Sequence, residues 1–186
     1  MEIKYLGSLT VLLKGKKESV TINPEAGEIK KESRIIIYTD KKRKLEIDKE
    51  KVFIRGPGEY EIGGVEIKGW GIDDKNLIYL IEIDGVIVGF LGESEEVLTD
   101  KMIEKITGID VLIASISKTK LSGKMLQDLA KKWGANYLIP IGYKTGDELI
   151  KKFLDDVDEE GLEAVDILKI DRDNLPDGLE VSLLKC

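Results

Sequence analysis

Residues 39–45, TDKKRKL, combine one carboxylate with four basic side chains shortly after an apolar segment. That segment, Ile35 to Ile37, is β-branched and apolar, as a buried strand is. Loops at the ends of buried strands commonly carry the functional residues of a fold. The carboxylate of Asp40 could bind a metal ion, whereas a lysine ammonium has no lone pair unless it is deprotonated. The stretch is therefore a functional site, a solvated loop, or the place of a site that has been lost.

The complete absence of histidine limits the chemistry further, and the single cysteine is the last residue, Cys186. Histidine is the commonest general base near neutral pH and the commonest ligand of catalytic zinc. A Cys/His metal site therefore cannot be built from one chain, and carboxylates remain as the available ligands. One cysteine cannot form an internal disulfide, which is typical of a reducing compartment, so we expect a cytoplasmic protein.

Two short motifs resemble those of serine enzymes. SISK at 115–118 has the pattern S-x-x-K, and KTG stands at 144–146. Serine β-lactamases and penicillin-binding proteins combine these motifs with S-D-N, which this sequence lacks. Ser115 also falls within a predicted strand, whereas the serine nucleophile of those enzymes opens a helix. We interpret both matches as chance and predict no catalytic residue from them.

The acidic turn GESEE offers a weaker possibility. Glu93, Glu95 and Glu96, with Asp40 nearby, could bind a hard cation such as Ca²⁺ or Mg²⁺. The alternative is a solvated acidic loop, and it is favoured because charge runs usually face water.

Length and charge define the broad class of the protein. The chain has 186 residues, which predicts a single domain over residues 1–186. The net charge of −7 argues against a nucleic-acid partner, because it would repel the phosphate backbone. No apolar run reaches the length of a membrane span, so we expect no membrane association and no targeting leader.

The predicted secondary structure that would position these residues differs between the two halves of the chain. The first half predicts strands, with turns at Gly7, at Gly63-Gly64 and at Asp84-Gly85. The second half alternates helices and strands. Helices are predicted over 100–106, 123–133 and 147–157, and Thr99, Ser122 and Thr145 can cap them. Gly134 ends the second helix, and Thr145 with Glu148 forms a capping box for the third. The chain closes with predicted strands over 165–170 and 179–184. This order predicts a mixed α/β layered domain with helices on the outside.

Several segments, taken together, resemble the metallo-β-lactamase fold and its small Zn-dependent hydrolase-like branch. The resemblance extends from Lys4 to Leu184 in the expected order, and its more specific parts are GPGEYEIGGVEIKG and LIYLIEIDGVIVGFLG followed by VLTD. It implies a four-layer α/β/β/α sandwich with metals bound at one rim between the sheets. The family's middle histidine loop is shortened here to the residues around Trp70 to Asp74.

The resemblance also implies where the metal ligands belong. The family's His-x-His-x-Asp-His run falls on residues 40–45, its bridging acid on Glu93 and its final histidine on Gly142. Its N-terminal Gly-His and Asp-Pro pairs appear here as Gly-Ser and Asn-Pro. Eight positions therefore mark a vestigial metal site, and none carries a histidine: Ser8, Asn23, Asp40, Lys42, Lys44, Leu45, Glu93 and Gly142.

These matches predict a metal-free, non-catalytic member of the fold, a pseudoenzyme without cofactor. It would act as a binding or structural module. It would either self-associate as a homo-oligomer or hold a small ligand in the cleft where the family binds its metals. The alternative is a hydrolase of unknown substrate with a carboxylate-based or partner-completed metal site. We expect Lys42 and Lys44 to be solvated and Glu93 to pair with one of them. Restoring the family's ligands should then restore zinc binding.

Overall fold

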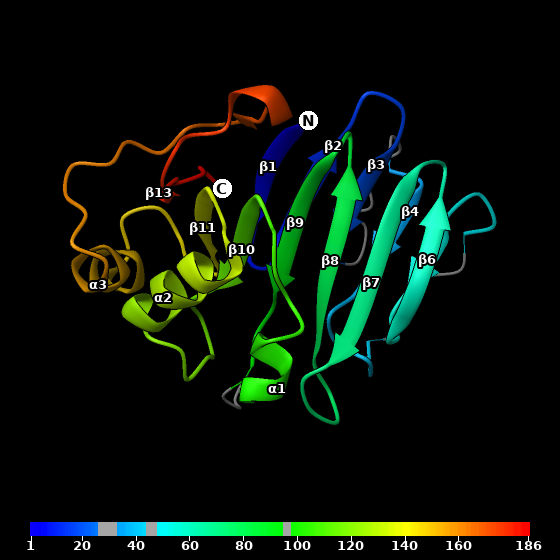
Figure 1. The fold of residues 1–186 in the computed structure, drawn as a ribbon, viewed down its shortest axis with the longest axis horizontal. Coiled ribbons are helices and arrows are strands. Elements are labelled where there is room, and N and C mark those ends of the chain that lie inside the picture. The colour runs from blue at the N-terminus through cyan, green and yellow to red at the C-terminus, as the bar shows by residue number, and fades with distance from the viewer. Residues whose placement is uncertain (26–32, 44–47, 95–97) are drawn as a thin grey trace.

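The computed structural model of the chain describes residues 1–25, 33–43, 48–94 and 98–186. Two mixed β-sheets make up most of it, with a few helices beside them (Figure 1). The predicted α/β sandwich is confirmed. Four residues considered above, Lys44, Leu45, Glu95 and Glu96, lie outside the described residues.

The first sheet is built from the N-terminal strands, in the order β12-β1-β2-β3-β4-β5. Their bounds are β1 Glu2–Gly7, β2 Thr10–Lys14, β3 Ser19–Ile22, β4 Ile35–Ile37, β5 Val52–Ile54 and β12 Leu168–Lys169. Strands β1 to β3 pair antiparallel, whereas β3, β4 and β5 pair in parallel. The parallel part brings the carboxyl ends of β3 and β4 to the same edge of the sheet.

The second sheet has the order β13-β11-β10-β9-β8-β7-β6. Its strands are β6 Gly58–Ile62, β7 Val65–Gly71, β8 Leu77–Ile83, β9 Val86–Leu91, β10 Val111–Ser115, β11 Tyr137–Ile141 and β13 Glu180–Val181. The predicted hairpins β6–β7 and β8–β9 are confirmed, and positive φ occurs at Gly63, Gly64, Asp84 and Gly85 as a type I′ turn requires. Strands β9, β10 and β11 are parallel, so their carboxyl ends also meet at one edge.

One apolar core joins the two sheets. In Figure 1 the strands of the first sheet lie behind those of the second, and the side chains between them are buried. Ile3 and Ile35 of the first sheet and Val88 and Ile113 of the second are completely inaccessible to solvent. Burial of such side chains contributes about 1.5–3 kcal/mol each, which makes this core the main source of stability.

Helices appear in the second half of the chain, as α1 Asp100–Ile103, α2 Gly123–Trp133 and α3 Glu148–Asp156. Helix α2 packs on β10 and β11 and has the predicted ends: the Ser122 hydroxyl accepts from the Met125 amide, and Gly134 ends the helix at φ +81°. Helix α1 is one turn long, shorter than the predicted 100–106, and the Thr99 side chain makes no capping bond. In the described part of the chain, no helix has both the length and the apolar character needed to cross a membrane.

The start of α3 differs from the prediction. The capping residue is Asp147, and Thr145 lies outside the helix with an exposed side chain. The Asp147 carboxylate accepts hydrogen bonds from the amides of Lys144 (2.8 Å) and Ile150 (3.0 Å). These backbone bonds hold the pKa of Asp147 below its ordinary value, because they favour the charged form. An aspartate directly before the helix therefore caps it in place of the predicted threonine.

The C-terminal strands are shorter than the predicted 165–170 and 179–184. Strands β12 and β13 have two residues each, and a 3₁₀ helix, Arg172–Asn174, lies between them. Pro176, which lacks an amide hydrogen, also falls in this connection. Both strands add to the edges of their sheets next to β1 and β11.

Candidate functional site

The predicted metal-site positions lie where strands of the two sheets end. Asn23 directly follows β3, Asp40 comes shortly after β4, Glu93 after β9, and Gly142 directly follows β11. These strands run in parallel within their sheets, so the four positions occupy carboxyl ends. Open α/β sheets bind ligands outside such ends.

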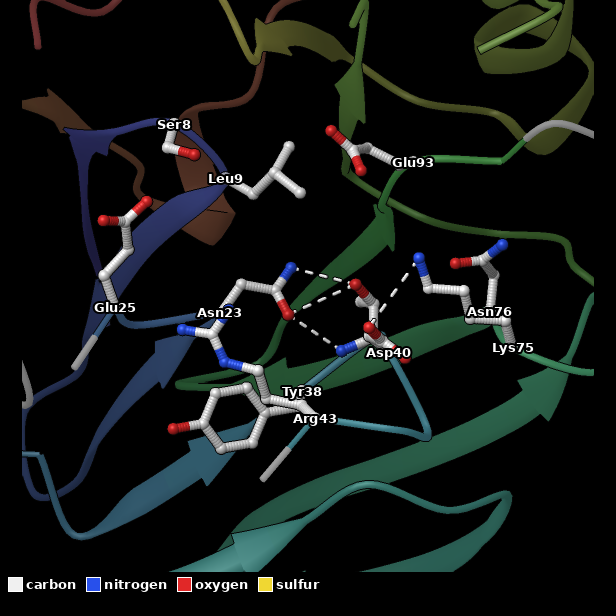
Figure 2. Close-up of a pocket in the computed structure, with 11 residues that line it drawn as sticks. Ser8, Leu9, Asn23, Glu25, Tyr38, Asp40, Arg43, Lys75, Asn76 and Glu93 are labelled. Atoms are coloured by element: carbon white, nitrogen blue, oxygen red, sulfur yellow. Dashed lines mark hydrogen bonds and ion pairs between the residues drawn. The ribbon is translucent and has the colours of Figure 1, made fainter. Parts of the chain in front are cut away.

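A pocket of about 120 Å³ opens at this rim. It is lined by residues from both sheets: Ser8, Leu9, Asn23, Glu25, Tyr38, Thr39, Asp40, Arg43, Lys75, Asn76 and Glu93. Figure 2 shows Asn23 and Asp40, which follow strands of the first sheet, with Glu93 and Lys75, which flank strands of the second.

Four of the eight predicted positions meet in this pocket, namely Ser8, Asn23, Asp40 and Glu93. Lys42 is exposed, as expected, and is not part of the lining. Lys44 and Leu45 lie outside the described residues.

Asn23 uses its side chain to join the ends of β3 and β4. Its Oδ1 accepts from the Thr39 amide at 2.8 Å, and its Nδ2 donates to Thr39 Oγ1 at 2.9 Å. Its backbone is left-handed, with φ +49°, and Ser8 across the pocket has φ +50°. Left-handed backbone at residues other than glycine is costly and often marks functional positions. Both polar atoms of the Asn23 side chain are thus hydrogen-bonded to Thr39.

Asp40 is engaged on both carboxylate oxygens. Oδ1 accepts from the Lys42 amide at 2.8 Å, and Oδ2 lies 3.8 Å from Lys75 Nζ. A backbone bridge between Asp40 and Asn76 brings the loop before β8 against this residue. The loop between β7 and β8 therefore packs against residues 40–41.

Asp73 organises that short loop. Its carboxylate accepts from the amides of Lys75 (2.7 Å) and Asn76 (2.6 Å), and its carbonyl accepts from Lys41 Nζ. Burial by itself raises the pKa of Asp73, but the hydrogen bonds from Asn76 and Lys75 and the charge of Lys41 outweigh it, so the pKa is lowered. Asp73 remains charged and holds the loop in place. No motif in the sequence indicated Lys75 or Asn76, because their contribution depends on how this loop folds.

Glu93 pairs with a lysine that the sequence did not suggest. Its Oε1 lies 3.4 Å from Lys118 Nζ and accepts from the Ser117 hydroxyl at 3.3 Å. The expected partner was Lys42 or Lys44; Lys44 lies outside the described residues, so that pairing stays a prediction. Lys118 is within reach because the end of β9 lies beside the end of its parallel neighbour β10, which Lys118 follows. Lys118 is 75% exposed, so the pair is worth at most about 1 kcal/mol.

Gly142 could not simply be exchanged for a ligand. Its φ is +85°, and a Cβ atom there would lie 2.5 Å from Ser117 Oγ and 3.0 Å from Ser115 Oγ. Its amide donates to the Tyr5 hydroxyl at 3.0 Å. Burial raises the pKa of Tyr5, so this hydroxyl stays neutral. The space that a side chain at position 142 would need is therefore taken by two serine hydroxyls.

The described residues do not fit a zinc ion. They contain no group of three or more His, Cys, Asp or Glu side chains placed to hold a metal. Zinc takes about four ligands, whereas both oxygens of Asp40 and the Oε1 atom of Glu93 already have partners within the chain. Two acids of the predicted hard-cation site, Glu95 and Glu96, lie outside the described residues.

Comparison with known proteins identifies relatives of this fold. The model of the beta-lactamase superfamily domain matches residues 2–142. No protein with curated annotation matches the sequence.

Solved structures resemble the whole chain. A proposed Zn-dependent hydrolase of the metallo-beta-lactamase superfamily from Thermotoga maritima is 25% identical and matches over 100% of both chains, with a TM-score of 0.80. The metallo-beta-lactamase fold protein YhfI from Bacillus subtilis is 12% identical over 99% of this chain and 96% of its own, with a TM-score of 0.64. A proposed metal-dependent hydrolase from Parabacteroides distasonis is 11% identical over 98% and 93%, also with a TM-score of 0.64.

Proposed function

The chain belongs to the beta-lactamase superfamily, and we propose that it is a member without a metal centre that acts as a binding or structural module. The supporting observation is that a lysine ammonium lies next to each of the two acids at the predicted metal-site positions. Lys75 pairs with Asp40 and Lys118 pairs with Glu93.

Asp40 and Glu93, two of the three acids that line this small pocket, need a compensating positive charge. Where a dication is bound, it supplies that charge, and like charges without it repel each other. Here the two ammonium groups supply it from within the chain. Because both lysines are more than half exposed, each pair adds little stability. Their effect is that Lys75 and Lys118 balance the charges of Asp40 and Glu93 without a metal ion.

A metal-dependent hydrolase of unusual type is the second candidate. The description of the Thermotoga maritima protein as a proposed Zn-dependent hydrolase favours it. Such an enzyme would use Asp40 and Glu93 with further ligands, either Glu95 and Glu96, which lie outside the described residues, or groups of a partner chain.

Metal analysis after dialysis separates the two candidates. We expect well under one equivalent of zinc per chain by elemental analysis, since the described residues do not supply about four ligands. A bound structural metal would contribute directly to the folding free energy, and its removal would lower the melting temperature. Because we expect no bound metal, chelator should leave the melting temperature unchanged. Stoichiometric zinc that chelator removes with a fall in melting temperature would contradict the proposal and favour the hydrolase.

A further inference from the structure

A second, larger cavity of about 360 Å³ lies where the loop after β10 meets α3. Ile116 and residues 118–123 form one side, and Leu149, Lys152, Phe153 and Asp156 of α3 form the other. It shares no lining residue with the pocket of Asp40 and Glu93. Its volume is within the range of small-molecule sites, roughly 300–1,000 Å³.

Cations collect at this cavity although the chain as a whole is acidic. Lys118, Lys120 and Lys152 line it, in a protein with 36 acidic and 29 basic residues. Lys118 is paired with Glu93, but neither Lys120 nor Lys152 forms an ion pair with any residue that the structure describes. Asp156, the acid in the lining, already accepts a hydrogen bond from the Gly123 amide at 2.9 Å. The ammonium groups of Lys120 and Lys152 can therefore pair with an anionic ligand.

The lining is mostly polar, but four of its eleven residues have apolar side chains. Ile116, Leu121 and Phe153 are buried, and Leu149 is partly exposed. A ligand that bound here could place a charged group between Lys120 and Lys152 and pack its carbon atoms on Leu149 and Phe153. A polar site with a smaller apolar part suits a small ligand that carries both a charged group and a compact apolar group.

We infer that this cavity binds a small phosphate monoester with a compact apolar body. The charge of a phosphate monoester near neutral pH, about −1.5 to −2, matches two unpaired ammonium groups better than a carboxylate does. Lysine also binds phosphate as a mobile point charge, with three N–H donors. The inference is independent of whether the pocket of Asp40 and Glu93 binds a metal.

Calorimetric titration with phenyl phosphate, inorganic phosphate, benzoate and phenol tests this assignment. The protein is kept in low-salt buffer without phosphate or divalent ions. Phenyl phosphate should bind at least about tenfold tighter than inorganic phosphate or benzoate, a difference of about 1.4 kcal/mol. Phenol should not saturate the protein, because it lacks the charged group.

Two double variants show where the probe binds. Lys120→Gln with Lys152→Gln should weaken phenyl phosphate binding at least about tenfold. Lys14→Gln with Lys68→Gln removes the same charge at exposed positions of β2 and β7 and should leave binding unchanged. All four substitutions are on exposed side chains, so both variants should fold.

Four results would overturn the inference. These are no saturation by phenyl phosphate up to about 10 mM, equal affinity for benzoate, binding that persists in the Lys120/Lys152 variant, or an equal loss in the Lys14/Lys68 variant. The last result would mean that the probe responds to net charge alone.

Discussion

The hydroxyl of Tyr5 shows how much a single residue contributes to the candidate site. Tyr5 is 3% exposed, and its oxygen accepts from the Gly142 amide while lying 2.9 Å from the Ser8 carbonyl and 3.0 Å from the Tyr143 carbonyl. It thus links β1 of the first sheet to the end of β11 in the second. Tyr5→Phe should lower the free energy of unfolding by about 1–3 kcal/mol, since it leaves a partly buried amide without its acceptor. Urea denaturation measures this loss.

Tyr60 provides the matched control for Tyr5. Its hydroxyl makes long bonds, 3.3 Å to the Gly56 carbonyl and 3.4 Å to the Pro57 carbonyl, on a half-buried side chain. Tyr60→Phe should change stability by no more than about 0.5 kcal/mol. Equal losses in both variants would mean that the Tyr5 hydroxyl has no particular importance at the rim.

The sequence predicted some residues of the candidate site, but not the ion pairs and contacts between its side chains. Asn23, Asp40 and Glu93 could be found because each follows a strand in an order that resembles a known family. The lysines that pair with the two acids, Lys75 and Lys118, could not, because each pair joins residues from loops that are distant in the sequence. Nor does a sequence show that a side chain at Gly142 would meet the Ser117 hydroxyl.

At the level of elements, the start of α3 gives a direct test of capping. Asp147→Ala removes the acceptor of the Ile150 and Lys144 amides and should cost about 1 kcal/mol of unfolding free energy. Thr145→Ala, two residues earlier, should cost less than about 0.5 kcal/mol, because Thr145 is exposed and outside the helix. Urea denaturation of both variants compares them. A larger loss for Thr145→Ala would restore the predicted capping box.

The cap of α3 should also depend on pH. The pKa of Asp147 is lowered in the folded protein, mainly by the bond from the Lys144 amide. A lowered pKa means that the stabilisation is present above the unfolded pKa of about 3.9 and is lost as pH falls through the folded value. The difference between the parent and Asp147→Ala should therefore be full at about pH 7 and smaller at about pH 3. A difference that is unchanged at about pH 3 would contradict the role of the charged carboxylate.

The elements that the sequence predicted well are those with strong local signals. The hairpins at Gly63-Gly64 and Asp84-Gly85 have residues suited to positive φ between alternating apolar strands, and Gly134 ends α2 for the same reason. The C-terminal strands β12 and β13 were predicted too long, because apolar character alone does not show how many residues find a partner strand. Pairing at a sheet edge is decided by tertiary structure.

At the scale of the whole molecule, the two sheets hold the strand ends that surround the pocket, and the proposal is that only the metal ligands there are missing. If only ligands were missing, replacing them should rebuild a zinc site without loss of stability. Five substitutions restore most of the family's ligands: Asp40→His, Lys42→His, Lys44→Asp, Leu45→His and Glu93→Asp. We expect this fivefold variant to fold and to bind zinc more tightly than the parent by calorimetry. Zinc affinity no better than that of the parent would mean that these five positions are not the ligand positions.

The sixth substitution, Gly142→His, should behave differently from the other five. A left-handed backbone costs a non-glycine residue about 1–2 kcal/mol, and the new Cβ would lie 2.5 Å from Ser117 Oγ. Added to the fivefold variant, Gly142→His should therefore lower the unfolding free energy by about 2 kcal/mol or more, measured by urea denaturation in chelator so that zinc does not contribute. Ser117→Gly in the same background should recover part of this loss, because it removes the hydroxyl and the Cβ that the histidine would meet. An unchanged stability on adding Gly142→His would show that this rim can still accept a ligand, and the loss of metal would then be a matter of side chains alone.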